Sequence, residues 1–427
     1  MRKAPDVLKF QHYPVVAGAA LLATGVTLAW WGKADIAPLF ENPMVRRGEL
    51  WRLVTSMFPH VGLMHLAFNI YWLWVFGTLV EEIYGHAKTA ALILLFGMAS
   101  GAFEYGFTFG GVGLSGVGYG LFGLLWVLSR RDPRFHDAVD SRTTGLFVIW
   151  FFFCILLTES GAMSVGNVAH GTGAVLGVLV GLAITQPERR ALLASTAALV
   201  VGFGLWAATL GRPVVNLSRY GAYQECKWGY DALQAGHYEQ AQRWLAQAVR
   251  YRFAEPVCRV DLASAEQHLG SRAAALADYR KAAEMGDKDA AYYLASVYER
   301  GDGVAINEQE AVRWFKAAAD HGSAEALNDL AWAFATGPAV RNPQAALEYA
   351  TRAVAADKDN PLYLDTLAEA QYANGKYEDA VRTEQKAIAS AKLEDRDAYK
   401  KSLFKYFVAE HGGRRKQLAT KQLATGN

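Results

Sequence analysis

Long apolar runs in the first half of the chain constrain its fold more than any other feature of the sequence. A helix needs roughly 20 mostly apolar residues to cross a bilayer. Seven runs approach that length, at residues 13–31, 60–83, 89–109, 114–128, 143–158, 166–184 and 191–210. They predict a polytopic bundle of seven membrane helices. The first run is long for a signal-peptide core and lacks a clear small-residue cleavage site, so we interpret it as an anchor.

Lys and Arg residues gather in the loops on one side of these predicted spans, and cytoplasmic loops usually carry the excess of positive charge. If the N-terminus is cytoplasmic, the inside segments carry ten Lys and Arg residues and the outside loops carry four, all in the first loop. We therefore expect an integral protein of a bacterial inner (plasma) membrane with a cytoplasmic N-terminus. After seven spans, the C-terminal half lies outside the cytoplasm.

The remaining sequence narrows the class of protein. Hydrophobic residues make up 52% of the 427 residues, yet from about residue 212 onward the chain is rich in Ala and charge. We divide it into a cytoplasmic N-terminus (1–12), a membrane domain (13–211), a helical repeat domain (212–411) and a disordered tail (412–427). A net charge of +2 without a basic stripe argues against a nucleic-acid partner, and three Cys suggest no Cys-based metal site.

Polar side chains gather near the outer ends of the second, fourth and sixth predicted spans, which all run from outside to inside. They are His65 and Asn69, Ser115, and His170. At 1.5 Å of rise per residue, all four lie within roughly 15 Å of the outer surface. Because polar side chains in lipid are costly and often functional, we expect these four to meet at one depth.

Glycines on the fourth and sixth spans allow the two backbones to approach closely. They are Gly116, Gly120 and Gly123 on one span, and Gly173, Gly177 and Gly181 on the other. A base must come within about 2.6–3.2 Å of a serine hydroxyl, and such a distance requires close helices. A lone serine among glycines is more often a packing residue, and a lone histidine more often structural. The convergence of several polar residues favours a catalytic site.

The residue types suggest a Ser-His dyad. His170 would accept the proton of Ser115, whose oxygen attacks a peptide carbonyl. The backbone N–H of Ser115 and the side chains of Asn69 and His65 would stabilise the oxyanion. No carboxylate lies near His170 in its span, so we expect Tyr119 to pack against the imidazole in place of an orienting Asp.

Glu104 is the acid nearest to these residues in a predicted span. We interpret it as a polar residue at the mouth of the site rather than as a catalytic group.

These residues together resemble the rhomboid intramembrane serine proteases. The matching segments are Trp51-Arg52, His60 to Asn69, Gly77 to Glu81, Gly113 to Gly116 with Tyr119, and Ala169-His170 with Gly173 and Gly177. The resemblance implies a six-helix core, to which the seventh span is an addition. It also implies cleavage of membrane-anchored substrates near helix-destabilising small residues, and no cofactor. It assigns Ser115 as nucleophile, His170 as base, and His65 and Asn69 as oxyanion partners.

Other features fit the resemblance without requiring it. His60 matches a second family histidine, which we interpret as a brace for the first loop. That loop, about residues 32–59, is amphipathic and suited to the membrane interface. The aromatic residues at 150–153 suit a lateral gate for a substrate helix, although lipid-facing aromatics are an equal alternative.

Two other functions compete with proteolysis. A non-proteolytic rhomboid-like protein would bind transmembrane helices without cutting them, but both dyad residues and both oxyanion side chains are present. A seven-span transporter would show paired broken helices and repeat symmetry, which we do not find in this sequence.

The C-terminal half repeats with a period near 34 residues. Alanines recur at Ala241, Ala275, Ala311, Ala346 and Ala380, each with a second alanine seven residues later. This period and small-residue pattern predict five tetratricopeptide-type helical hairpins from about 220 to 391, capped by a helix near 394–410. The third and fourth units look like the related Sel1 repeat. The chain is thus all-α, a membrane bundle followed by an α-solenoid.

Such a solenoid offers a concave face for a protein partner. Recruitment of substrates or partners is a hypothesis from the architecture alone, and self-association is its competitor. Cys226 and Cys258 lie 32 residues apart, nearly one repeat. They would form a disulfide outside the cytoplasm, and buried free thiols are the equal alternative.

Overall fold

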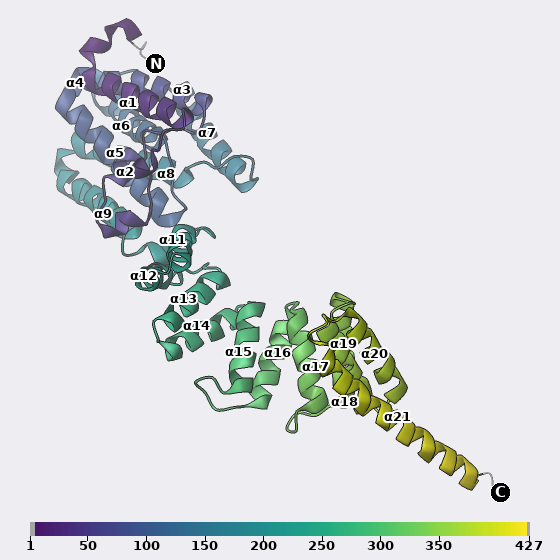
Figure 1. Ribbon diagram of the computed structural model, residues 1–427. Coiled ribbons are helices and arrows are strands. Elements are labelled where there is room, and N and C mark those ends of the chain that lie inside the picture. The colour runs from purple at the N-terminus through teal and green to yellow at the C-terminus, as the bar shows by residue number, and fades with distance from the viewer. Residues whose placement is uncertain (1–4, 425–427) are drawn as a thin grey trace. The chain divides into compact units, whose positions relative to one another are not determined.

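The computed structural model describes residues 5–424, and all regular secondary structure in that range is helical (Figure 1). These residues form two compact units. The membrane unit contains residues up to 228 together with 246–254. The repeat unit contains residues 229–245 and those from 255 onward.

Seven long helical segments make up most of the membrane unit. They are α1 (Pro14–Trp31), a segment of α3 (Leu63–Trp72), η4 (Leu73–Gly77) and α4 (Thr78–Tyr84), α5 (His86–Phe107), α6 (Ser115–Arg131), α7 (Ser141–Glu159), α8 (Asn167–Thr185) and α9 (Arg190–Ala208). The short helices are η1 (Val7–His12), η2 (Ala37–Leu39), η3 (Pro43–Arg47), α2 (Arg52–Thr55), η5 (Pro133–Phe135), η6 (Pro187–Arg189) and α10 (Arg212–Val215).

Six of these segments are long and apolar enough to cross a membrane. The exception is α6, which the sequence analysis counted as a span but which has only 17 residues. At 1.5 Å per residue it is about 26 Å long, shorter than the roughly 30 Å of the hydrocarbon core. Its last turn carries Arg130 and Arg131, which favour the membrane surface. If that end lies at the surface, the first residue, Ser115, lies below the opposite surface.

Helix α6 is the centre of the membrane unit. Twelve of its residues are buried. Its glycines lie against those of α8: a Cβ on Gly173 would collide with the carbonyl oxygen of Gly116, and one on Gly177 would collide with that of Gly120. The two backbones are therefore in direct contact, as the glycine spacing predicts.

The first loop is fixed by a buried arginine. Arg52 is 8% exposed, and its Nη1 donates to the carbonyls of Ala37, Pro38 and Phe40 at 3.1, 2.7 and 3.1 Å. This cross-linking makes the loop a folded element, and it brings Glu41 toward the second half of α5.

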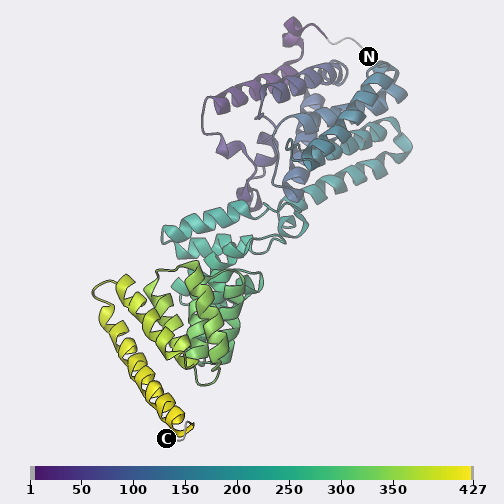
Figure 2. The ribbon, with the colours of Figure 1, turned by 90° about the vertical axis from the view of Figure 1, so that its right-hand side faces the viewer.

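The repeat unit consists of stacked helical hairpins (Figure 2). Its helices are α13 (Pro256–His268), α14 (Arg272–Glu284), α15 (Lys288–Arg300), α16 (Glu308–Asp320), α17 (Ala324–Thr336), α18 (Pro343–Ala356), α19 (Pro361–Ala373), α20 (Tyr377–Ser390) and α21 (Arg396–Ala424). Helices α11 (Tyr223–Gln234) and α12 (Tyr238–Ala248) precede them and have residues in both units. The predicted all-α solenoid of hairpins is confirmed.

The structure differs from the expected tail in the extent of its last helix. Helix α21 continues to residue 424, whereas the sequence analysis ended the cap helix near 410 and expected residues 412–427 to lack structure. The tail is rich in Lys, Gln, Leu and Ala, all good helix formers, so it extends α21 even without an apolar period. Residues 425–427 lie outside the described range.

Candidate active site

Ser115 is the first residue of α6 and is half-buried. The loop before it is held by backbone hydrogen bonds from two directions. The N–H of Gly113 donates to the carbonyl of Ser56 at 3.3 Å, and that of Leu114 donates to Nε2 of His60 at 3.3 Å. The position of the serine is thus set by residues far away in the sequence.

His60 is fully buried and braces this loop. Its Nδ1 lies 2.8 Å from the carbonyl of Phe58, so Nδ1 carries the proton and Nε2 accepts from Leu114. Burial, with a contribution from neighbouring His65, lowers the pKa of His60 to about 4, which keeps the ring neutral at pH 7. The sequence analysis expected a brace for the first loop; the structure adds that His60 also holds the loop before Ser115.

Gly113 must be glycine for two reasons. Its φ is 106°, in the left-handed region that favours glycine. A Cβ there would also lie 2.8 Å from Nε2 of His65 and 3.4 Å from Nδ2 of Asn69. The side chains of these two residues therefore lie against the backbone two residues before Ser115.

His65 and Asn69 each have a buried polar atom that makes no hydrogen bond. Nδ1 of His65 and Nδ2 of Asn69 are both buried without a hydrogen-bond partner. Leaving a buried donor unpaired costs about 1–3 kcal/mol, and such atoms often mark a site that receives a ligand. Together with the first N–H groups of α6, they can stabilise negative charge beside Ser115.

His170 is one turn before Gly173 on α8 and is 3% exposed. Its ring stacks on Tyr119, with centroids 4.6 Å apart and planes 24° from parallel. The Tyr119 hydroxyl in turn donates to the carbonyl of Phe147 at 3.2 Å. The stacking of Tyr119 on the imidazole that the sequence analysis expected is therefore present. Nδ1 of His170 has no hydrogen-bond partner, so no acid orients the ring.

Ser115 and His170 both lie within one turn of the α6–α8 contact, because Gly116 follows the serine directly and touches Gly173, three residues after the histidine. No hydrogen bond joins the hydroxyl to the imidazole among the described residues. Catalytic hydrogen bonds are often long without substrate and tighten only in the complex.

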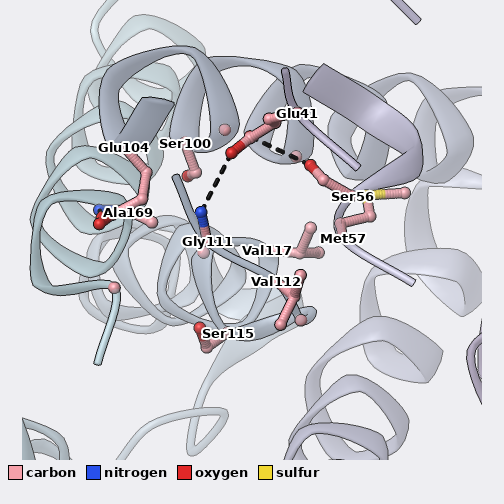
Figure 3. Close-up of a pocket in the computed structure, with 15 residues that line it drawn as sticks. Glu41, Ser56, Met57, Ser100, Glu104, Gly111, Val112, Ser115, Val117 and Ala169 are labelled. Atoms are coloured by element: carbon pink, nitrogen blue, oxygen red, sulfur yellow. Dashed lines mark hydrogen bonds between the residues drawn. The ribbon is translucent and has the colours of Figure 1, made fainter. Parts of the chain in front are cut away.

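A small cavity lies beside Ser115 (Figure 3). Its volume is about 30 Å³, enough for a water molecule or two. It is lined by Ser115 and by the side chains of Glu41, Ser56, Ser100 and Glu104, among others. The Ser100 hydroxyl is buried without a partner.

The carboxyl groups of Glu41 and Glu104 both line this cavity, and the sequence analysis did not predict the contacts that they make. Glu41, 7% exposed, accepts from the N–H of Gly111 at 3.0 Å and from the Ser56 hydroxyl at 3.1 Å (Figure 3). Burial raises the pKa of Glu41 to about 8, against the opposing effect of these hydrogen bonds. Sequence reasoning missed Glu41, because its partner lies 70 residues away and no local pattern marks it.

Glu104 is not a polar residue at the mouth of the site, as the sequence analysis interpreted it. It is 5% exposed, and its Oε2 accepts from the backbone N–H of Ala169 at 2.9 Å. It thereby occupies the N-terminus of α8, where a carboxylate is favoured by the helix dipole and by the unpaired N–H groups. The signal was present, since an acid in an apolar span must bind a specific partner.

The aromatic segment of α7 divides between two environments. Phe147 is buried, and Phe152 and Phe153 are 64% and 43% exposed. Trp150 contacts Phe68 of α3 with centroids 5.5 Å apart. α7 and α3 therefore meet through large side chains, whereas Phe152 and Phe153 are exposed on the surface of the unit.

Among the described residues there is no cluster of His, Cys, Asp or Glu that could hold a metal ion.

These observations define a polytopic membrane helix bundle in which a serine begins one helix and a buried histidine lies on the helix packed against it, with unpaired polar groups nearby. Residues 47–187 match the Rhomboid domain, and residues 279–287, 288–323 and 324–358 match the Sel1 repeat. Part of the membrane unit is therefore similar to the rhomboid domain, and part of the repeat unit is similar to Sel1 repeats. The latter two Sel1 segments coincide with the third and fourth hairpins, as the sequence predicts.

Similar proteins include the rhomboid proteases GlpG of Salmonella typhi and Salmonella typhimurium, each 32% identical over 154 residues. The alignments cover 34% of this chain and 52% of each relative, so the chain spans about half the length of the curated relatives it matches.

Solved structures of repeat proteins are also similar. A Sel1 repeat protein from Oxalobacter formigenes is 20% identical, with a TM-score of 0.35 over 50% of this chain and 87% of that one. The pilF structure from Pseudomonas aeruginosa is 20% identical, with a TM-score of 0.33 over 49% and 95%.

Proposed function

We propose that the protein is an intramembrane serine protease that hydrolyses peptide bonds in or next to transmembrane segments of membrane-anchored proteins. The observation that carries this proposal is the contact of α6 and α8 at Gly116 and Gly173, because Ser115 directly precedes the first glycine and His170, whose Nδ1 has no hydrogen-bond partner, lies one turn before the second. The rhomboid domain and the names of the relatives support the same activity.

In the proposed mechanism Ser115 Oγ attacks the scissile carbonyl while His170 takes its proton. The N–H of Ser115 and the side chains of His65 and Asn69 donate to the oxyanion. His170 then protonates the leaving amine, and a water molecule hydrolyses the acyl-enzyme with the same histidine as base. The cavity beside the serine has room for that water.

Tyr119 replaces the acid of a triad in this mechanism. Its ring face lies against the imidazole and fixes the ring plane. Gly116, Gly173 and Gly177 keep the two helix backbones close, and Gly113 leaves room for the side chains of His65 and Asn69. No cofactor or metal takes part in the proposed reaction. The hydrolysis needs only an oriented base, oxyanion donors and water.

For topology we propose a cytoplasmic N-terminus and an extracytoplasmic repeat domain in a bacterial inner membrane. The excess of Lys and Arg on one side of the spans supports it. Cys226 and Cys258 are both disulfide-bonded, a state that persists in oxidising compartments.

Cleavage of a generic membrane-anchored substrate by the purified protein in detergent tests the activity. We expect Ser115→Ala and His170→Ala each to lower kcat/KM by at least about 10³-fold, several kcal/mol of lost barrier reduction. Ser129→Ala, at the other end of α6, is the matched control and should retain activity. Comparable turnover in either dyad variant would contradict the dyad. Retained binding of transmembrane segments without any cleavage by the wild type would favour the alternative, a non-proteolytic rhomboid-like binder.

For the repeat domain we propose recruitment of a protein partner or substrate, with self-association as the alternative. Removing residues 255–427 leaves the residues of the membrane unit in place. Loss of cleavage for some substrates but not for others would support recruitment, whereas unchanged cleavage of all of them would remove it. End-point labelling of Ser115 with a fluorophosphonate reports whether the shortened chain is still folded.

A further inference from the structure

The segment that follows the last span is fastened to the end of α5. Asn216 is 2% exposed, and its Nδ2 donates to the carbonyls of Thr108 at 2.6 Å and Gly106 at 3.1 Å. The N–H of Leu217 donates to the carbonyl of Phe107 at 2.9 Å. The last carbonyls of a helix lack partners within it. Here the segment supplies them from more than 100 residues away in the sequence.

The same end of α5 holds the beginning of α8. The Thr108 hydroxyl lies 2.8 Å from Oε1 of Glu104, and Oε2 of Glu104 accepts from the N–H of Ala169 at 2.9 Å. Ala169 directly precedes His170. A continuous series of hydrogen bonds therefore runs from Asn216 through Thr108 and Glu104 to the backbone next to the imidazole.

His170 depends on this support more than a triad histidine would. Its Nδ1 has no hydrogen-bond partner, so only the stacked Tyr119 and the placement of α8 fix the ring. The first turn of α8 is itself fixed by Glu104. Misplacing a reacting group by about 1 Å from a remote change can slow a reaction up to about 10²-fold.

A buried arginine secures the segment from the other side. Arg212 is 2% exposed. Its Nε donates to the carbonyl of Tyr105 at 2.9 Å and its Nη1 to that of Gly221 at 3.0 Å. Nη1 also donates to the hydroxyl of Tyr251, which donates to Oε1 of Glu225 at 2.8 Å. These residues all belong to the membrane unit, which thus extends past the boundary at 211 that the sequence analysis chose.

We propose that Asn216 is a positioning residue for His170, acting through the end of α5 and Glu104. The inference rests on the proposed protease function. In this arrangement the segment after the last span is a working part of the catalytic unit rather than a passive link to the repeats.

The test compares Asn216→Ala with wild type in the full-length chain. We expect kcat to fall about ten-fold while KM stays within about two-fold, because the base moves and the substrate-binding surfaces do not. The rate constant for labelling of Ser115 by a fluorophosphonate should fall by a similar factor. The end-point of labelling should remain near that of wild type, since the site is intact but poorly aligned.

Asn374→Ala is the matched control. Its Nδ2 donates to the carbonyl of Ala370 at 2.8 Å at a helix end in the repeat unit, so it makes the same kind of contact away from the site. We expect no change in kcat. If Asn216→Ala fails to fold, Thr108→Val takes its place, because it interrupts the same series at the hydroxyl that lies 2.8 Å from Oε1 of Glu104.

A double-mutant cycle with Thr108→Val sharpens the test. Both changes interrupt one series of contacts, so the double variant should be little slower than the slower single variant. Rates within two-fold of wild type in all these variants, or a fall in rate fully explained by a lower labelling end-point, would overturn the proposal. If wild type itself neither cleaves substrate nor labels at Ser115, the protease function fails instead.

Discussion

The two units of this chain solve the packing of helices in different ways. In the membrane unit glycines bring backbones into contact, as between Gly173 and Gly116. In the repeat unit the contacts are made by buried alanines such as Ala282, Ala295 and Ala318. Lipid tails supply no hydrophobic driving force between helices, so close backbone contact must replace it. In water, burial of the alanine methyl groups itself favours packing.

The buried acids of the two units also differ in the kind of hydrogen-bond partner that they have. In the membrane unit Glu81 accepts from the N–H of Val16 at 3.0 Å, and Glu41 and Glu104 also accept from backbone N–H groups. Each joins two segments distant in sequence. In the repeat unit the buried Glu369 accepts from Lys405 at 2.7 Å. These three acids of the membrane unit thus hold backbone N–H groups of distant segments, whereas Glu369 of the repeat unit joins side chains.

Among changes that test this comparison, the largest effect is expected where the glycine contact is broken. Gly173→Ala places a methyl group on the carbonyl oxygen of Gly116, so α6 and α8 must separate. We expect kcat/KM to fall at least about 100-fold, because the hydroxyl and the imidazole move apart. The substrate cleavage assay measures this. Gly18→Ala is the control, since nothing lies within 4 Å of its added Cβ; equal loss in both variants would contradict the comparison.

A smaller effect concerns the pH dependence of the repeat unit. Glu384 is fully buried, and burial, together with the nearby charge of Asp365, raises its pKa to about 9. The folded state therefore holds a proton that the unfolded state loses above about pH 4.5, so the free energy of unfolding falls as pH rises between these values.

Glu384→Gln should remove much of this slope and raise the melting temperature of the repeat unit by about 4 °C or more at pH 9. Hydrogen exchange of α19–α21 during thermal unfolding at pH 5, 7 and 9 measures it. Glu378→Gln, on the same helix but outside this cluster, is the control. Parallel pH profiles for wild type and Glu384→Gln would contradict the expectation.

The smallest expected effect concerns the number of thiols per chain that react with a thiol reagent. With Cys226 and Cys258 disulfide-bonded and Cys154 free but 2% exposed, the native chain should react with almost no thiol reagent. Unfolding without reductant should release one thiol per chain, and unfolding with reductant three. Three thiols without reductant, from protein isolated under alkylating conditions, would count against an oxidising location for the repeats.

The sequence predicted those features that depend on the periodicity and spacing of residues along the chain. The apolar runs and the alanine period define the helices of both units, and the glycine spacing on α6 and α8 anticipates their contact. Sequence reasoning did not reach Glu41 or Asn216, and it misinterpreted Glu104, because their partners lie 65 to 110 residues away. Such contacts exist only once the fold has formed. They follow from which unpaired backbone groups end up adjacent, and no local pattern records that.

The shortness of α6 bears on which proteins this site would accept. A helical segment in lipid keeps its backbone groups paired with one another, and exposing them to hydrocarbon is strongly unfavourable. To present a peptide bond to the Ser115 hydroxyl below the membrane surface, a substrate helix must first unfold by about one turn. It must do so where polar groups can form hydrogen bonds with its backbone. We therefore expect substrate selection to depend less on a particular residue sequence than on how readily the substrate helix unfolds locally.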